Sequence, residues 1–224
     1  MGSIIVLMGA QGAGKGTQAK MLAERSGLPI VATGDMLRAA AEEDTPLGRQ
    51  IREVQTAGHL VSDSVLAEVV SRRTSLDDCS NGYILDGFPR TLTQARLLEE
   101  IAASQGHRIC VIEISVPREL LFKRLTGRRT CSGCGATYNI YFKPSKEEGI
   151  CDLDGKPLFI RSDDNEEAIA KRLALYDEMT LPLLDYYAQV GYLHRVDGDA
   201  PPEEVSERIA EIVSANEKRS AAER

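Results

Sequence analysis

The chain has 224 residues, of which 42% are hydrophobic, so it is long enough to bury a core and is not disordered in composition. It carries 27 Lys and Arg against 34 Asp and Glu, and its formal net charge of −7 argues against a protein that coats nucleic acid or an anionic membrane. The chain does not open on a basic stretch followed by an apolar segment, and no apolar run is long enough to cross a bilayer. We therefore expect a cytoplasmic protein with one globular domain.

The first predicted element is a buried strand over residues 4–8, and a glycine-rich segment follows it directly. Residues 9–17 read Gly-Ala-Gln-Gly-Ala-Gly-Lys-Gly-Thr. The glycines let successive N–H groups point inward, and the helix expected next directs the positive end of its dipole to the same place. Lys15 can reach terminal phosphates and Thr17 can offer its hydroxyl to Mg²⁺, as in a P-loop, although Gly16 separates the two residues here. This pattern predicts a binding site for a nucleoside triphosphate.

Further apolar runs of strand length alternate with helical patterns along the rest of the chain. They cover residues 28–32, 83–85, 109–116 and 192–196. Strands with few polar positions that alternate with helices favour a parallel sheet covered on both faces and joined by right-handed crossovers. We therefore predict an α/β fold, a three-layer sandwich around a five-stranded parallel sheet.

Two stretches interrupt this alternation and are predicted to be inserted subdomains. The first, about residues 32–61, has a helical pattern in which Thr45 and Pro46 suit the N-cap and the first turn of a helix. The second, about residues 126–164, is rich in Gly, Lys, Cys and Asp and is too long for a bare loop in a compact domain. Another interaction must therefore hold the second insertion together.

Cysteine spacing in the second insertion supplies that interaction. Cys131 and Cys134 form one C-x-x-C pair, and Cys151 and Asp154 repeat the spacing after 16 intervening residues. Three thiolates and a carboxylate fill a tetrahedral Zn²⁺ site, which makes the predicted site structural, with Asp152 as a competing fourth ligand. An odd total of five cysteines suits a metal site in a reducing compartment better than a disulfide framework. Of the remaining two cysteines, Cys110 is predicted in the core and Cys79 in a polar turn.

Asp86 ends the predicted strand at residues 83–85 and opens the turn Gly-Phe-Pro-Arg. The carboxyl edge of a parallel sheet is where α/β proteins bind ligands, so Asp86 can hold a metal-bound water opposite Thr17. Arginines that could contact phosphate are spread along the chain at Arg38, Arg90, Arg128, Arg129, Arg161 and Arg172.

Five segments in order make the chain resemble the adenylate kinases, specifically the bacterial type with a long zinc-bearing lid. These segments are 9–17, Thr-Gly-Asp-Met-Leu-Arg at 33–38, Gly-His-Leu-Val at 58–61, Asp-Gly-Phe-Pro-Arg at 86–90 and Gly-Arg-Arg at 127–129. The resemblance covers nearly the whole length. It implies a single P-loop nucleoside-phosphate kinase domain over 1–224, with an AMP-binding insertion at about 32–61 and a lid at about 126–164.

The same resemblance implies roles for individual residues. For ATP it implies Gly12, Ala13, Gly14, Lys15, Gly16, Thr17, Arg124, Arg128, Tyr138 and Ala200. For AMP it implies Thr33, Gly34, Arg38, His59, Val61, Gly87, Arg90, Gln94, Arg161 and Arg172, with Thr33 and Gln94 placed to read the base. The implied catalytic cations are Lys15, Arg38, Arg90, Arg128, Arg161 and Arg172, and Thr17 and Asp86 are implied to hold Mg²⁺ through water.

The implied reaction is reversible phosphoryl transfer, ATP + AMP = 2 ADP, which serves adenine nucleotide homeostasis. Positioning and charge stabilisation dominate such a transfer. No general base is needed, because the phosphate of AMP, with a second pKa of about 6, is already largely ionised near neutral pH. The lid is expected to close over bound substrates and exclude water. The expected cofactors are Mg²⁺ with ATP and structural Zn²⁺, and the expected state is a monomer that binds neither nucleic acid nor membrane.

Two departures from the family pattern concern the ATP side. Gln11 stands where the family commonly has Pro, so the loop is expected to be less stiff while it keeps its phosphate-facing N–H groups. The segment 197–201, which usually contacts adenine through backbone atoms, contains Asp199 and Ala200. Donor-base selectivity is therefore less firmly implied than phosphate binding.

Three other functions compete with this interpretation. A zinc-knuckle nucleic-acid-binding module predicts a basic chain with exposed aromatic residues, whereas this chain is acidic and has no Trp. A P-loop switch that hydrolyses nucleotide leaves Arg38, Arg90 and Gln94 without a purpose. A related kinase for UMP or CMP typically has a short lid and lacks Thr33 in this context, so the long metal-bearing insertion favours AMP.

Overall fold

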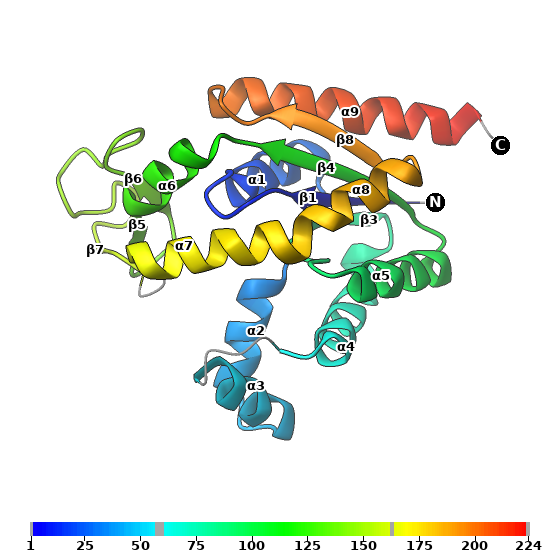
Figure 1. Ribbon diagram of the computed structural model, residues 1–224, viewed down its shortest axis with the longest axis horizontal. Helices are drawn as coiled ribbons and strands as arrows, with labels where there is room; N and C mark the ends of the chain where they lie inside the picture. The colour runs from blue at the N-terminus through cyan, green and yellow to red at the C-terminus, as the bar shows by residue number, and fades with distance from the viewer. Residues whose placement is uncertain (1, 57–60, 162–163, 223–224) are drawn as a thin grey trace.

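A five-stranded parallel sheet forms the centre of the protein. The computed structural model describes residues 2–56, 61–161 and 164–222 (Figure 1). The strands are β1 (Ser3–Met8), β2 (Ile30–Ala32), β3 (Gly82–Asp86), β4 (Arg108–Ser115) and β8 (Leu193–Asp197), in the order β2-β3-β1-β4-β8. All five predicted strands are confirmed, with bounds that shift by one or two residues.

Helices cover both faces of this sheet because side chains alternate along each strand. In β1, Ile4 and Val6 pack in one core with α4, α5 and α8, whereas Ile5 and Leu7 pack in another with α1, α6, α7 and α9. The three-layer prediction is therefore confirmed. The helices and helical turns of these layers are α1 (Lys15–Ser26), α4 (Asp63–Thr74), η1 (Asp77–Cys79), α5 (Leu92–Gln105), α6 (Arg118–Thr126), α7 (Glu166–Leu175), the π-helical turn η2 (Tyr176–Thr180), α8 (Leu181–Gln189) and α9 (Pro202–Ala222).

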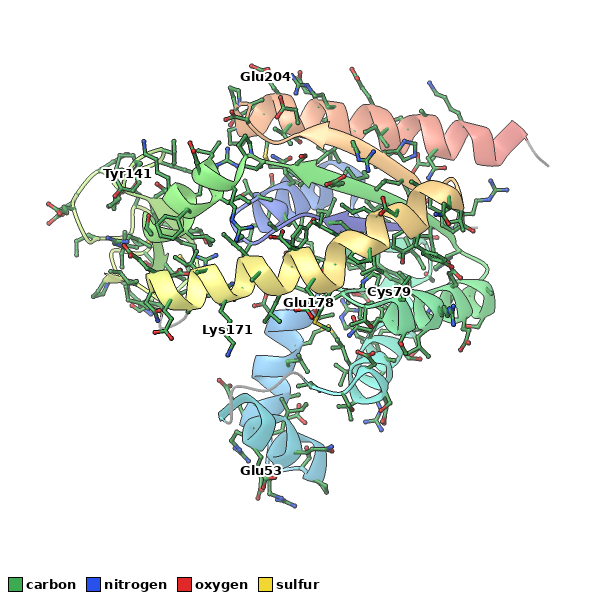
Figure 2. All side chains as sticks on the ribbon, in the orientation of Figure 1. Glu53, Cys79, Tyr141, Lys171, Glu178 and Glu204 are labelled. Atoms are coloured by element: carbon green, nitrogen blue, oxygen red, sulfur yellow. The ribbon has the colours of Figure 1, made fainter. Side chains whose placement is uncertain are left out.

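The first insertion consists of two helices, α2 (Thr33–Glu42) and α3 (Pro46–Thr56), which project away from the sheet in Figure 1. The Thr45 Oγ1 accepts a hydrogen bond from the N–H of Gly48 at 3.0 Å, as predicted for an N-cap. Figure 2 shows Glu53 on the outer part of this insertion and Cys79 close to the body of the protein.

The second insertion is a small antiparallel sheet, and it has little apolar material of its own. Its strands are β5 (Arg128–Cys131), β6 (Thr137–Asn139) and β7 (Leu158–Phe159), in the order β6-β5-β7. Within the described residues its buried core is limited to Cys131, Tyr138 and Cys151, with Ala136 and Leu158 packed against them. A core of this size cannot by itself stabilise such a segment.

The two cysteines outside this insertion are both buried. Cys110 lies in β4 at 1% exposure, as predicted for a core residue. Cys79, predicted in a polar turn, lies in η1 at 0% exposure, where the Arg73 guanidinium donates a hydrogen bond to its Sγ at 3.2 Å. Among the residues that the structure describes, none of the helices has the length and apolarity needed to span a bilayer.

Candidate active site

The glycine-rich segment forms a loop between β1 and α1 that leaves backbone donors available. Gly9, Gly12 and Gly14 have φ values of 142°, 86° and 99°, which residues with a side chain rarely adopt. Gly14 is the N-cap of α1, and no side chain of the described residues caps it. The first N–H groups of α1 therefore remain available for an anion at the positive end of the helix dipole.

The side chain of Lys15 folds back over this loop. Its Nζ donates to the carbonyl oxygens of Gly9 at 2.7 Å and Ala10 at 3.1 Å. The pKa of Lys15 is lowered to about 8: burial is the largest cause, Asp86 opposes the shift, and the nearby positive charges of Arg90, Arg172 and Arg128 contribute to it. The structure therefore brings four of the predicted phosphate-binding cations to one place.

Asp86 lies at the carboxyl end of β3, beside the loop. A Cβ atom built on Gly16 would lie 3.6 Å from its Oδ2, so the carboxylate faces the first turn of α1. The next residue, Thr17, is exposed. The two side chains predicted to hold Mg²⁺ thus come from the two elements that meet at this edge of the sheet.

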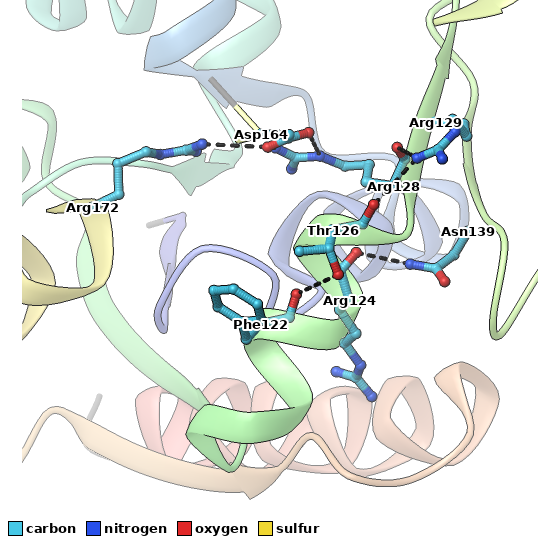
Figure 3. Close-up of polar contacts among 8 residues, drawn as sticks. All are labelled: Phe122, Arg124, Thr126, Arg128, Arg129, Asn139, Asp164 and Arg172. Carbon is cyan, nitrogen blue, oxygen red and sulfur yellow. Dashed lines mark hydrogen bonds and ion pairs between the residues drawn. The ribbon is translucent and has the colours of Figure 1, made fainter. Parts of the chain in front are cut away.

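A buried carboxylate, Asp164, joins two of the arginines (Figure 3). The Arg128 side chain donates to it from Nε at 2.7 Å and also from Nη2, and the Arg172 Nη1 lies 3.5 Å from its Oδ1. The Asp164 side chain is 0% exposed. Arg128 begins β5 and Arg172 lies in α7, so this carboxylate ties the second insertion to the body of the protein.

Sequence reasoning missed Asp164, which it used only as the end of the second insertion. Its position between Arg161 and Arg172 is the signal that could have found it, because arginines that are buried together need a negative charge beside them. Arg161 is partly buried next to it, and its carbonyl oxygen accepts a hydrogen bond from the N–H of Asp164 at 3.0 Å.

The predicted acceptor side gathers around Gly87. A Cβ atom on Gly87, whose φ is 88°, would lie 2.8 Å from the Thr33 Oγ1 and 3.2 Å from the Arg90 Nη2. The Arg90 Nε donates to the Gly87 carbonyl oxygen at 2.9 Å, and the Gln94 Oε1 accepts from the N–H of Arg90 at 2.7 Å. The structure therefore brings Thr33, Gly87, Arg90 and Gln94 together.

The remaining acceptor-side predictions are described unevenly. Gly34 lies in α2, and Val61 lies two residues before α4. Arg38 also belongs to α2, but its side chain is outside the described part of the structure, and His59 lies wholly outside it. The proposed contacts of all four residues with AMP stay predictions.

The predicted donor-base side lies where α6 meets the segment after β8. The Arg124 Nη2 donates to the Gly198 carbonyl oxygen at 3.0 Å, two residues before Ala200, and burial lowers the pKa of Arg124. Figure 3 also shows Asn139, whose Nδ2 donates to the Arg124 carbonyl oxygen at 2.8 Å. Together with a bond from the N–H of Ile140 to the Gly127 carbonyl oxygen at 2.9 Å, this contact fastens the second insertion to the end of α6.

Tyr138, predicted at the ATP site, lies instead among the thiols. It is 6% exposed, its hydroxyl lies 3.5 Å from the Cys151 Sγ, and it accepts a hydrogen bond from the N–H of Asp152 at 2.8 Å. A contact between Tyr138 and ATP stays a prediction.

The four predicted metal ligands converge. The Sγ atoms of Cys131, Cys134 and Cys151 and a carboxylate oxygen of Asp154 all lie within 4.8 Å of one another. A hydrogen bond from Cys131 lowers the pKa of Asp154 to about 2, so this carboxylate is charged at neutral pH. Asp152, the competing ligand, accepts from the N–H of Lys146 at 2.9 Å instead. Three sulfurs and one oxygen at this spacing suit Zn²⁺.

Comparisons with known proteins show the family to which the chain is similar. The family model described as adenylate kinase matches residues 7–192. The chain is 47% identical to the adenylate kinase of Bacillus subtilis over 96% of this chain and 99% of the relative. It is 48% identical to that of a Geobacillus species, over 93% and 97%, and 47% identical to that of Thermodesulfovibrio yellowstonii, over 93% and 98%.

We expect affinity for ATP to fall above about pH 8. In the protein without nucleotide, the pKa of Lys15 is lowered to about 8, so its charge is lost as the pH rises through that value. The terminal phosphate of ATP, with a pKa of about 6, is already ionised there. Calorimetric titration from pH 6.5 to 9.5 should show the dissociation constant rising by up to about tenfold per pH unit above 8. Lys15→Arg keeps its charge throughout and should remove this dependence. A flat wild-type profile would contradict the assignment.

The Asp164→Asn variant should lower the free energy of unfolding by about 2 kcal/mol, because it leaves two partly buried guanidinium groups without their counter-charge. Its matched control is Asp177→Asn, which breaks the exposed pair with Arg118, where the side chains are 46% and 59% exposed. That change should cost less than about 1 kcal/mol. Urea denaturation measures both, and equal losses would argue against a special role for Asp164.

Proposed function

Because the chain belongs to the adenylate kinase family and is therefore a phosphotransferase, we propose that it converts ATP and AMP reversibly into two ADP. The observation that carries the proposal is the convergence of Lys15, Arg90, Arg128 and Arg172 at the end of the parallel sheet. Two nucleotides that exchange a phosphoryl group bring several negative charges together, and these cations offset their repulsion.

In this proposal the glycine-rich loop binds the phosphates of ATP. Its free N–H groups and the Lys15 ammonium hold the terminal phosphates, and Lys15 exchanges its bonds to Gly9 and Ala10 for bonds to phosphate oxygens. Arg124 and Ala200 flank the donor base. Magnesium supplies charge neutralisation on the phosphates, and Thr17 and Asp86 would hold it through water, which suits an exposed hydroxyl opposite a carboxylate.

AMP occupies the acceptor side. The residues expected around it are Thr33, Gly34, Arg38, Val61, Gly87, Arg90 and Gln94, together with His59, which lies outside the described residues. The Arg90 guanidinium binds the AMP phosphate and holds one of its oxygens in line with the terminal phosphate of ATP. Arg128, Arg161 and Arg172 stabilise the charge that spreads over the transferred group. No proton needs to be removed, because the attacking oxygen is already ionised.

The residues 32–61 and 126–164 act as an AMP-binding insertion and a lid in this proposal. The contact between Asp164 and the two arginines supports the second assignment, since it couples the position of the lid to the position of phosphate-binding side chains. A closed lid would exclude water as a competing acceptor. Cys131, Cys134, Cys151 and Asp154 would hold Zn²⁺ as a structural ion that does not take part in the reaction.

Two other reactions fit parts of the site less well. Hydrolysis of nucleotide would use the loop, Lys15 and Asp86 but leaves the cluster around Gly87 without a ligand. Transfer to UMP or CMP uses the same phosphate contacts. The long second insertion with its cluster of possible metal ligands, and Thr33 beside Gly87, favour AMP as the acceptor.

A product assay tests the reaction itself. With Mg²⁺, ATP and AMP we expect ADP to accumulate without free phosphate, and Arg90→Met should lower kcat by about a thousandfold because it removes the cation that holds the attacking AMP phosphate in line. Arg96→Met changes an exposed arginine on α5 and should leave the rate nearly unchanged. Release of phosphate, or no ADP from the wild-type protein, would overturn the proposal.

Metal removal tests the lid assignment. Purified, unoxidised protein should contain about one equivalent of zinc by elemental analysis. After chelation, limited proteolysis should cut between residues 132 and 157 first, because the lid core there is too small to persist without the ion. Cys134→Ser should reproduce this sensitivity, whereas Cys110→Ala, a thiol buried in β4, should not. Protein without bound metal would remove the basis of the assignment.

A further inference from the structure

Asp63, the first residue of α4, was not among the predicted site residues, yet it contacts the predicted acceptor side. Its carboxylate lies at the start of α5, which packs beside α4 below the sheet in Figure 1. Oδ1 accepts a hydrogen bond from the Gln94 Nε2 at 2.7 Å, and Oδ2 accepts one from the Thr91 hydroxyl at 3.0 Å. Both partners belong to the first turn of α5, so Asp63 holds the segment that carries Gln94.

The same contacts fix which way the Gln94 amide points. A carboxylate can only accept, so the amide nitrogen of Gln94 must face Asp63. The N–H of Arg90 can only donate, so the amide oxygen must face Arg90, where the distance is 2.7 Å. If the amide were rotated by 180°, its nitrogen would face the Arg90 N–H, another donor, and its oxygen would face the Asp63 carboxylate, another acceptor. The orientation therefore follows from donor and acceptor chemistry and does not depend on atom assignment.

Thr91 adds a third restraint. Its Oγ1 accepts from the N–H of Gln94 at 3.2 Å as the N-cap of α5, while its hydroxyl hydrogen goes to Asp63. The side chain of Gln94 is therefore held at its backbone and at both ends of its amide, and it is only 4% exposed. One hydrogen on Nε2 and one lone pair on Oε1 remain for a ligand.

The remaining Nε2 hydrogen and Oε1 lone pair of Gln94 can distinguish adenine from hypoxanthine. The Watson–Crick edge of adenine offers a donor at N6 and an acceptor at N1, which match an amide oxygen and an amide hydrogen held in fixed order. Hypoxanthine offers an acceptor at O6 and a donor at N1, the reverse order. A fixed amide pairs with the first and opposes the second, whereas a freely rotating amide can pair with either.

We propose that Asp63 is a specificity-determining positioning residue, which fixes the amide of Gln94 so that the enzyme takes AMP and rejects 6-oxopurine monophosphates. The inference rests on the proposed function, in which Gln94 reads the acceptor base. Asp63 itself does not touch the nucleotide in this proposal. Its effect is therefore confined to the acceptor, and the ATP side should not respond to its loss.

The test compares kcat/KM for AMP and for IMP, with ATP as donor, in four variants. Asp63→Ala should narrow the preference for AMP over IMP by about tenfold, the effect of one misplaced hydrogen bond, and raise the KM for AMP but not for ATP. Asp63→Asn keeps one acceptor oxygen and should restore most of the preference. Tyr186→Phe removes another bond to α5, that between the Tyr186 hydroxyl and Glu99 at 2.7 Å, and should leave the preference unchanged. Gln94→Leu should abolish base discrimination by this edge.

The outcomes separate the inference from the function on which it rests. If Asp63→Ala slows AMP and IMP equally, or if Asp63→Asn does not restore the preference, Asp63 only stabilises α4 and α5 and the inference is wrong. If Gln94→Leu keeps the full preference, Gln94 does not read the base, and the inference falls while phosphoryl transfer stands. If the wild-type protein makes no ADP, the proposed function itself fails. Thermal denaturation of each variant confirms that folded protein is being compared.

Discussion

The mutual repulsion of the cations that gather at the end of the parallel sheet is the constraint on which this site depends. Burial is the main reason why the pKa of Lys15 is lowered, and the positive charges of Arg90, Arg172 and Arg128 contribute to the shift. Burial also strengthens the mutual repulsion of these cations. Two carboxylates offset it. Asp86 faces the loop, and Asp164 binds Arg128 side-on and approaches Arg172. The two carboxylates thus hold these side chains in one place, which is the kind of preorganisation that electrostatic stabilisation requires.

The parallel sheet determines where this charge can gather. β1 delivers the glycine-rich loop and β3 delivers Asp86 at the same edge, because parallel neighbours end side by side. The two insertions leave the sheet from this region, and they carry further predicted site residues such as Thr33 and Arg128. The chain as a whole is acidic, with a net charge of −7, yet Lys15, Arg90, Arg128 and Arg172 gather near the end of the sheet, so the local charge there is opposite to that of the whole chain.

Local patterns in the sequence predicted most of the fold, and the contacts between distant residues account for what was missed. Strands β1 to β4 and β8 were predictable because buried parallel strands are nearly continuous apolar runs, and the cap at Thr45 because it depends on neighbouring residues alone. The convergence of Cys131, Cys134, Cys151 and Asp154 was predictable from their spacing. Asp164 and Asp63 were missed because each acts through side chains 8 to 36 positions away, and a local pattern does not identify such a pair. Tyr138 was assigned to ATP through resemblance, whereas its hydroxyl lies at the thiols.

The attachment of the second insertion to the end of α6 has a mechanical consequence. The Asn139 side chain and the Ile140 N–H donate to the carbonyl oxygens of Arg124 and Gly127, so the hairpin is bonded directly to the last turn of the helix. The Arg124 side chain extends from the same turn and donates a hydrogen bond to the Gly198 carbonyl oxygen. Any tilt of the hairpin would therefore shift the last turn of α6 and, with it, the Arg124 side chain that contacts the segment after β8.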